Sequence, residues 1–346
     1  MTSMADRITG GVDTHLDVHV AAALDHLGAL LGTRSFPATA AGYRQLLRWL
    51  GSFGDVVLIG VEGTGSYGAG LTRHLLAQGI EVVEVDRPNR QNRRRRGKSD
   101  TVDAVAAARA AQSGDATGKA KTRDGNVEAM RVLRLVKLSA RRSRTVALNQ
   151  MRSIVATGPE ELRETMRDLS AHQLIQRAGA LRPGGRSDVL GATKVALRHL
   201  ARRAQAFQDE IDEIDALLEP LVTETAPELL ACEGVGPDVA SALLVAAGDN
   251  PERLRSERTF AHLCGVAPLD ASSGKHERHR LSRAGDRQAN SALWRVVMTR
   301  LTCDPRTKDY VERRMKEGLT KREAMRCLKR YVAREVFAHL PRERVA

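Results

Sequence analysis

Aromatic residues are scarce in this sequence, which has 5 Phe, 4 Tyr and 2 Trp among 346 residues. Proteins that bind single-stranded nucleic acid commonly stack the bases on aromatic side chains. A chain with so few rings supplies such platforms poorly. If this protein binds nucleic acid, we expect recognition to depend mainly on phosphate groups.

Cysteine and long hydrophobic runs are also rare. The four cysteines are widely separated and form no C-x-x-C pair, which predicts neither a zinc site nor a disulfide framework. We expect reduced, mostly buried thiols. No segment approaches the length of a membrane span, and the N-terminus has no apolar signal region. These absences predict a cytoplasmic protein with no membrane partner, associated with the nucleoid if it binds DNA.

Positive charge is abundant instead. Lysine and arginine number 55 against 42 aspartates and glutamates, a formal net charge of +13. Such an excess favours a polyanionic partner, with nucleic acid as the first candidate. A membrane surface is the weaker alternative, because the basic residues are spread over several segments rather than along one amphipathic helix.

The first 125 residues alternate between strand-like and helix-like patterns. Three consecutive strands are expected in "ITGGVD", "DVHVAAALD" and "ALLGTRSF", followed by a helix at 39–50 and a buried strand in "DVVLIGVEG". A helix at 67–78, the strand "EVVEVD", a basic loop and another helix complete the pattern. A three-strand meander followed by β–α units predicts an α/β domain with a mixed sheet.

The region from about 127 to 221 loses strand character and is expected to be helical, with an interruption at "LRPGGRSD". Apolar residues spaced alternately by three and four indicate a coiled-coil seam that ends at Pro220. The partner of this seam is either a helix of the same chain, at 132–155, or a second protein copy. Its residues are Leu197, Leu200, Ala204, Phe207, Ile211, Ile214 and Leu218.

The C-terminal third is predicted to be mainly helical. In "ELLACEGVGPDVASALL", Gly234 and Gly236 separate two short helices, as in a helix-hairpin-helix whose backbone N–H groups approach a phosphate. A tight turn between packed helices is the alternative. Further on, "PLDASSGKHERHR" reads on its own as a solvated loop.

Four acids form the most informative pattern. Asp13 ends the first strand and Glu62 ends a later buried strand, so parallel neighbouring strands would place both carboxylates at one sheet edge. Asp100 and Asp103 are three residues apart on one helix face and could reach the same edge. Clustered carboxylates repel one another, so a protein gathers them chiefly where a cation such as Mg²⁺ binds. Two such ions could stabilise both oxygens of a phosphoryl transfer.

Each acid also has an ordinary structural interpretation. Asp13 fits a turn, Glu62 a solvated strand end, and Ser99 or Asp100 a helix cap. Asp17, four residues beyond Asp13, is expected to be a surface residue. The arginine run before Asp100 could be a solvated loop.

The order of these acids resembles the ribonuclease H-like nucleases of Holliday-junction resolvase type. A closer resemblance links the chain to the DEDD transposases and Piv-type DNA invertases of bacterial insertion sequences. It rests on six motifs in the right order: "GVDTHLD", "VEGTGSY", "GKSDTVDA", "EGVGPDVASALL", "CGVAPLDASSGK" and "LSRAGDRQAN". The helical middle matches that family only in character and length.

The resemblance implies a composite active site and a division into three domains. These are a ribonuclease H-like catalytic domain at 1–125, a helical coiled-coil and oligomerisation region at 126–225, and a C-terminal transposase domain at 226–346. It implies that Asp13, Glu62, Asp100 and Asp103 hold Mg²⁺. It further implies that Ser273 forms a phosphoserine link to DNA, with the adjacent Ser272 as the alternative.

The resemblance also implies a dimer or tetramer that recombines donor and target DNA and is guided by a structured bridge RNA. Two other functions stay open: a metal-dependent junction nuclease without a serine intermediate, and a nucleic-acid-binding protein without catalysis. The predicted nucleic-acid contacts are Arg90, Arg93, Arg94, Arg95, Arg96, Gly234, Gly236, Lys275, Arg278, Arg280 and Arg283.

Overall fold

The computed structural model describes residues 7–85, 99–184, 188–249, 254–270, 279–280, 282 and 285–341. The chain forms two compact units. Residues up to Gly125 make most of the first, and Asn126–Ala246 with Glu257–Pro341 make the second. The division into three domains stays a prediction. Within the described ranges, no helix is both long and apolar enough to cross a bilayer.

The first unit contains a mixed sheet of six strands in the order β3-β2-β1-β4-β5-β6. β1 runs parallel to β4 and β4 parallel to β5, whereas the other neighbours are antiparallel. The predicted meander followed by β–α units is therefore confirmed, and the sheet fits a ribonuclease H-like domain. Its elements are β1 (Arg7–Thr14), β2 (Val18–Leu24), β3 (Leu30–Pro37), α1 (Ala40–Gly51), β4 (Asp55–Glu62), α2 (Ala69–Ala77), β5 (Glu81–Val85), α4 (Asp100–Gln112) and β6 (Gly118–Lys119).

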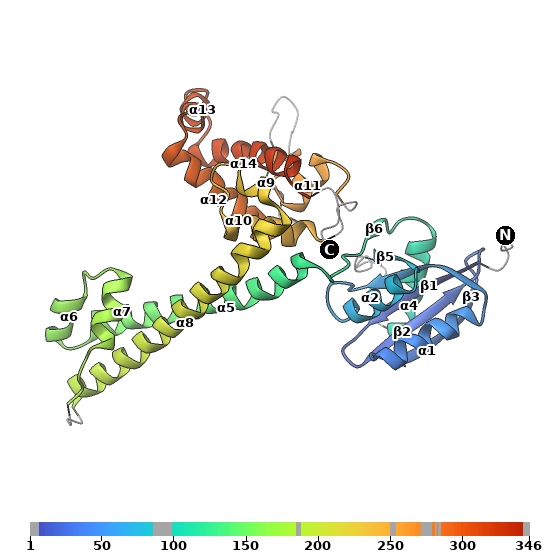
Figure 1. Cartoon of the computed structure of the whole chain (residues 1–346), viewed down its shortest axis with the longest axis horizontal. Coiled ribbons are helices and arrows are strands. Elements are labelled where there is room, and N and C mark those ends of the chain that lie inside the picture. Colours follow the sequence, from blue (N-terminus) through green and yellow to red (C-terminus); the bar gives the residue numbers. More distant parts are fainter. Residues whose placement is uncertain are drawn as a thin grey trace. The chain divides into compact units, whose positions relative to one another are not determined.

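Helices cover both faces of this sheet (Figure 1). On one face, Leu46 of α1 and Leu71 of α2 pack in the main core cluster with Val12 of β1. On the other face, Ala104 of α4 packs with Val20 and other residues of β2. β1 is buried on both sides beyond its first residue, as expected for the central strand of a covered sheet.

Helix α4 approaches the sheet closely because glycines lie beneath it. A β-carbon on Gly11 of β1 would lie 2.2 Å from the backbone nitrogen of Ala108, and one on Gly60 of β4 would lie 2.5 Å from the carbonyl oxygen of Ala107. The buried side of α4 consists largely of alanines. Small residues on both surfaces therefore set the distance between the helix and the sheet.

Gly11→Ala is expected to lower the free energy of unfolding of this unit by about 1–3 kcal/mol, because the new methyl group must displace helix backbone. Urea unfolding followed by Trp49 fluorescence, in a Trp294→Phe background, would measure it. The control Gly51→Ala adds its methyl group in open space and should be neutral or stabilise by about 0.4–1 kcal/mol. Equal stabilities of the two variants would contradict the close approach.

The second unit is almost entirely helical, in agreement with the predicted character of the middle and C-terminal regions. α5 and α8 run side by side, and α7 packs against α8 (Figure 1). Its elements are α5 (Asn126–Thr157), α6 (Glu160–Met166), α7 (Ala171–Gly179), α8 (Val189–Thr225), α9 (Pro227–Leu230), α10 (Pro237–Ala247), α11 (Glu257–Leu263), β7 (Leu269–Asp270), β8 (His279–Arg280), α12 (Arg287–Cys303), α13 (Pro305–Lys316) and α14 (Lys321–Ala338).

The predicted heptad seam lies along α8 and faces α5 of the same chain. All seam residues are buried except Phe207, which is half-buried. The expected stop at Pro220 is wrong, because α8 continues to Thr225. A proline removes one helical hydrogen bond, but Leu218 and Val222 on either side are fully buried and hold the last turn in place. Whether a second copy also packs on this region stays a prediction.

Asp238 connects three helices of the second unit. It lies in the first turn of α10 and accepts hydrogen bonds from Arg134 at 3.1 Å and Lys137 at 2.7 Å, both on α5. Arg295 of α12 also pairs with it, and Arg141 lies 3.6 Å away. Burial acts to raise the pKa of Asp238, but the bonds from Arg295 and Lys137 and the surrounding positive charge hold it well below its usual value.

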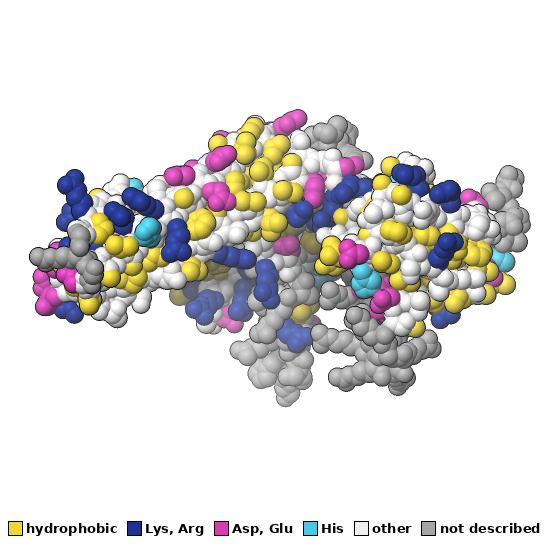
Figure 2. Space-filling model, turned by 90° about the horizontal axis from the view of Figure 1, so that it is seen from below, with side chains coloured by type: hydrophobic (Ala, Val, Ile, Leu, Met, Phe, Trp, Pro, Cys, Tyr) yellow, Lys and Arg dark blue, Asp and Glu magenta, His cyan; other side chains and the backbone are white. Residues whose placement is uncertain are grey.

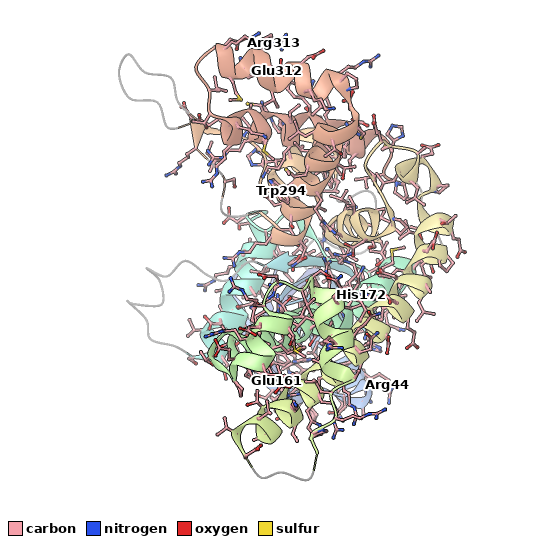
Figure 3. All side chains as sticks on the ribbon, turned by 90° about the vertical axis from the view of Figure 1, so that its left-hand side faces the viewer. Arg44, Glu161, His172, Trp294, Glu312 and Arg313 are labelled. Atoms are coloured by element: carbon pink, nitrogen blue, oxygen red, sulfur yellow. The ribbon has the colours of Figure 1, made fainter. Side chains whose placement is uncertain are left out.

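Asp238→Asn is expected to destabilise the second unit by about 3 kcal/mol, because its buried cations lose their counter-charge. With its depressed pKa, Asp238 contributes stability that is complete at neutral pH and is lost as the pH falls below about 4. Far-UV circular dichroism during urea unfolding would measure both effects. The control is Glu312→Gln on the exposed side of α13 (Figure 3), which should be neutral. If both variants behave alike, the ion-pair cluster does not stabilise the unit.

Candidate active site

The sheet brings the first two predicted acids to the same edge. β1 and β4 are parallel neighbours, and Val12 is paired with Val61 in the last recorded step of their register. Asp13 and Glu62 are the next residues of the two strands. Asp13 is buried and Glu62 is half-buried. The expected adjacency of the two strand ends is therefore confirmed, although their role in catalysis stays a prediction.

Helix α4 supplies two further acids. It begins at Asp100, with Ser99 as its N-cap residue, and Asp103 lies in the same first turn. The Ser99 hydroxyl bonds to Thr101 rather than to the helix backbone, so the helix start has no side-chain cap of the usual kind. Asp103 is buried and Asp100 is exposed.

Three of the four acids interact electrostatically. Burial raises the pKa of Asp13, nearby His15 opposes that effect, and the charges of Asp103 and Asp100 raise the pKa further. Like charges that share a site behave in this way because each disfavours ionisation of the others. The arrangement therefore concentrates negative charge at the end of β1.

His15 is part of this cluster and was not among the predicted site residues. Its Nε2 atom lies 3.2 Å from the Asp13 carboxylate and 3.4 Å from that of Asp100. Within the described ranges, Asp13, His15 and Asp100 are the group whose ligand atoms lie within 4.8 Å of one another. The available signal was the sequence "DTH", which places the imidazole two residues beyond a strand-end carboxylate.

The donor set fits a divalent cation. Carboxylate oxygens are the ligands that Mg²⁺ prefers, and an imidazole also suits transition metals such as Mn²⁺ or Zn²⁺. The pKa of Asp13 is raised first by burial and then by the charges of Asp103 and Asp100, and a bound cation would oppose all three effects. The threonine next to Asp13 ties the strand ends together, because Thr14 Oγ1 donates to the Glu62 carbonyl oxygen at 2.7 Å.

The second unit carries the remaining predicted site residues. β7 and β8 form an antiparallel pair in which Leu269 opposes exposed Arg280, and residues 271–278 connect the two strands. The following predicted residues lie outside the described ranges: Arg90, Arg93, Arg94, Arg95, Arg96, Ser272, Ser273, Lys275, Arg278 and Arg283.

The two predicted hairpin glycines differ in their surroundings. Gly234 has a φ of 77° and packs against Val296 and Thr299 of α12, so a turn between packed helices explains it. Gly236 is exposed, and a β-carbon there would meet open space. Since α9 spans only Pro227–Leu230, the helix-hairpin-helix and its phosphate contact stay predictions.

The four cysteines are free in this structure. Cys232 and Cys264 are buried, whereas Cys303 is exposed. The expectation of mostly buried thiols holds for two of the four.

Comparison with known sequences finds matches for two regions of the chain. Residues 10–157 match the DEDD transposases of IS110 type, and residues 226–312 match the transposase family of IS116, IS110 and IS902. Both regions are therefore similar to transposases of IS110 type. The first match includes all four predicted acids, and the second includes Gly234, Gly236 and Ser273.

Individual relatives agree with this family. The 43.6 kDa protein of insertion element IS110 from Streptomyces coelicolor is 35% identical over 156 residues, which is 43% of this chain and 35% of that protein. The 42 kDa protein of IS900 from Mycobacterium paratuberculosis is 27% identical over 47% of the chain and 41% of its own length. A probable family 20 transposase from Pseudomonas aeruginosa is 28% identical over 57% of the chain and 58% of its own length. The matched stretches thus cover about a third to three fifths of these relatives.

Asp13→Asn is expected to stabilise the metal-free protein. Because folding raises the pKa of Asp13, its ionised form costs stability, and this cost grows as the pH rises through the raised pKa. The variant should melt roughly 1–3 °C higher than the wild type in EDTA at neutral pH. Added MgCl₂ should raise the melting temperature of the wild type but not of the variant.

The control for this experiment is Asp17→Asn, four residues further along the chain, where the side chain is exposed as predicted. It should leave both the melting temperature and the response to MgCl₂ unchanged. A Mg²⁺ response in Asp13→Asn equal to that of the wild type would contradict the metal site.

Proposed function

We propose that this protein is an insertion-sequence transposase that acts as a site-specific DNA recombinase. The observation that carries the proposal is the convergence of Asp13, Asp100 and Asp103 at the end of β1, beside the strand that ends in Glu62. The two regions of IS110 transposase type support it. Phosphoryl transfer on DNA is the chemistry that suits such an acidic cluster.

In this proposal, Asp13, Glu62, Asp100 and Asp103 hold Mg²⁺. When bound, the metal would neutralise negative charge on the phosphate that is transferred. The chain positions the ligands from two directions, because Asp13 and Glu62 end paired strands and the other two lie in the first turn of α4. His15 lies between Asp13 and Asp100 and would act as a further ligand or as an orienting partner.

Ser273 is the proposed nucleophile. Its Oγ would attack the scissile phosphorus, and its proton would pass to a base or to solvent. The Oγ–P bond forms as the P–O bond to the departing strand breaks, and that strand leaves as a hydroxyl after protonation. Attack by the hydroxyl of a new strand then restores the phosphodiester and releases serine, so rejoining needs no external energy source.

The proposed partners are donor and target DNA and a structured bridge RNA, bound by a dimer or tetramer that assembles through the helical region 126–225. The net charge of +13 supports binding to polyanions. Arg280 of β8, seven residues after Ser273 in the sequence, is exposed as such a contact requires.

A junction nuclease is the second candidate, because Asp13, His15 and Asp100, whose ligand atoms lie together, all belong to the first unit. In that case water replaces serine as the nucleophile. A binding protein without catalysis is the third, and the presence of all four acids argues against it.

Ser273→Ala is expected to abolish the covalent protein–DNA adduct, detected on denaturing gels with end-labelled DNA and MgCl₂. The neighbouring Ser272→Ala is the matched control and should retain the adduct. If the adduct is lost only in Ser272→Ala, Ser272 and not Ser273 is the nucleophile. Adducts present at the wild-type level in both variants would refute a serine intermediate at these two positions.

Asp103→Asn is expected to reduce metal-dependent strand exchange to background while leaving the far-UV spectrum unchanged. Strand cleavage that survives Ser273→Ala, requires Asp103 and leaves no protein attached would favour the junction nuclease. If neither variant changes recombination in cells, the protein is a binding module.

A further inference from the structure

Charge is unevenly distributed along the helical arm, which we define as α5 and α8. Two contacts fix the antiparallel register of these helices: Lys137 pairs with Asp215, and a β-carbon on Gly158 would lie 3.5 Å from Thr193. Residues whose numbers sum to about 351–352 therefore lie level with each other. We divide the arm at Arg144 of α5 and the level position of α8, residue 208, into an inner part and an outer part that differ in charge.

The inner part, 126–143 with 209–225, contains charges of both signs. It has 5 cations and 8 acids, and the ion pair Lys137–Asp215 crosses from α5 to α8. The outer part, 144–157 with 189–208, contains no acid at all. Its 6 cations are Arg144, Arg152, Lys194, Arg198, Arg202 and Arg203.

Half of the outer cations are exposed, and all but one have no carboxylate partner within the described ranges. Arg152, Arg202 and Arg203 are exposed. Across the described ranges, the sole ion pair of this set is Lys194 with Glu161 of α6 at 3.3 Å (Glu161 is labelled in Figure 3). The Nε atoms of Arg144 and Arg198 are buried and have no hydrogen-bond partner in the same ranges.

The spacing of these cations produces a row. Lys194, Arg198 and Arg202 follow one another at intervals of four, so they share one flank of α8 with about 6 Å between neighbours. Like charges at this spacing destabilise a helix. Figure 2 shows lysine and arginine side chains on the end of the arm that carries α6 and α7.

The outer part is nevertheless well packed. Met151 of α5, Met166 of α6, Leu174 of α7 and Leu197 of α8 belong to one buried cluster. Since this core holds the outer arm together, the cationic row is not required for its folding. A row of like charges in which Arg198 and Arg202 have no carboxylate partner within the described ranges, next to exposed Arg203, is the arrangement expected of a surface that receives a polyanion.

We propose that the outer arm binds the sugar-phosphate backbone of double-stranded DNA. A duplex fits better than a single strand, because Phe207 is the one Phe, Tyr or Trp in these segments and bases would have no stacking platform. About 20 residues of α8 extend roughly 30 Å, which corresponds to about nine phosphates along one strand. The choice of DNA over RNA rests on the proposed function.

The test is the binding of a fluorescent DNA duplex, in EDTA so that no strand chemistry occurs. The variant Arg198→Gln/Arg202→Gln/Arg203→Gln should raise Kd at least about 10-fold near physiological salt, and it should flatten the slope of log K against log salt by about 2 to 3. Glutamine retains the helix propensity of arginine. The matched control Arg306→Gln/Arg322→Gln/Arg326→Gln removes the same charge from exposed positions of α13 and α14 and should change Kd less than about threefold.

Equal weakening by both triple variants would overturn the proposal, since net charge alone would then explain binding. Unchanged binding by the arm variant would overturn it too, and so would a loss confined to an RNA duplex of the same sequence. If the triple variant fails to fold, Arg202→Gln alone should still flatten the slope by about 0.9, and an unchanged slope would refute the contact. Because the assay needs neither metal nor Ser273, its failure leaves the proposed recombination to be judged by the adduct assay.

Discussion

The contact between α4 and the sheet is the constraint on which the first unit depends. Gly11 and Gly60 have no side chains, and the helix presents Ala104, Ala107 and Ala108 to them. A hydrophobic layer of ordinary size would hold the helix several ångströms farther away, since helix and sheet would be separated by two sets of side chains. The small residues therefore bury less apolar volume, but they let the backbone of α4 approach the sheet closely.

Proximity matters because α4 begins at the edge where β1 and β4 end. Asp13 leaves the sheet there, and the first turn of α4 brings further carboxylates to it. Burial raises the pKa of Asp13, and the charges of Asp103 and Asp100 raise it further, so ionised Asp13 is disfavoured at this place. A fold that brings acids together at such a cost is stabilised by a cation or by an imidazolium, and His15 occupies the position where either could act.

The sequence allowed the strands β1 to β5 and their succession along the chain to be predicted, because period-two patterns are local signals. The meeting of Asp13 and Glu62 depended on β1 and β4 being parallel neighbours, which the structure supplies. His15 was missed, since its role depends on a side-chain direction that no periodicity encodes. The stop at Pro220 was wrong because burial on both sides of the proline outweighed its local preference. The partner of the α8 seam was undecided, since a heptad pattern shows that a helix is needed but not which chain supplies it.

The helical arm is stabilised in different ways along its length, by ion pairs in its inner part and by apolar packing in its outer part. In the inner part, Lys137 of α5 pairs with Asp215 of α8 and with Asp238 of α10. In the outer part, the four-helix apolar cluster takes over the stabilising role, and acids are absent from both helices. If charge pairing were needed there for stability, acids opposite Arg198 and Arg202 would supply it easily. Their absence keeps the positive potential available, which has a physical use only when a negatively charged partner is bound.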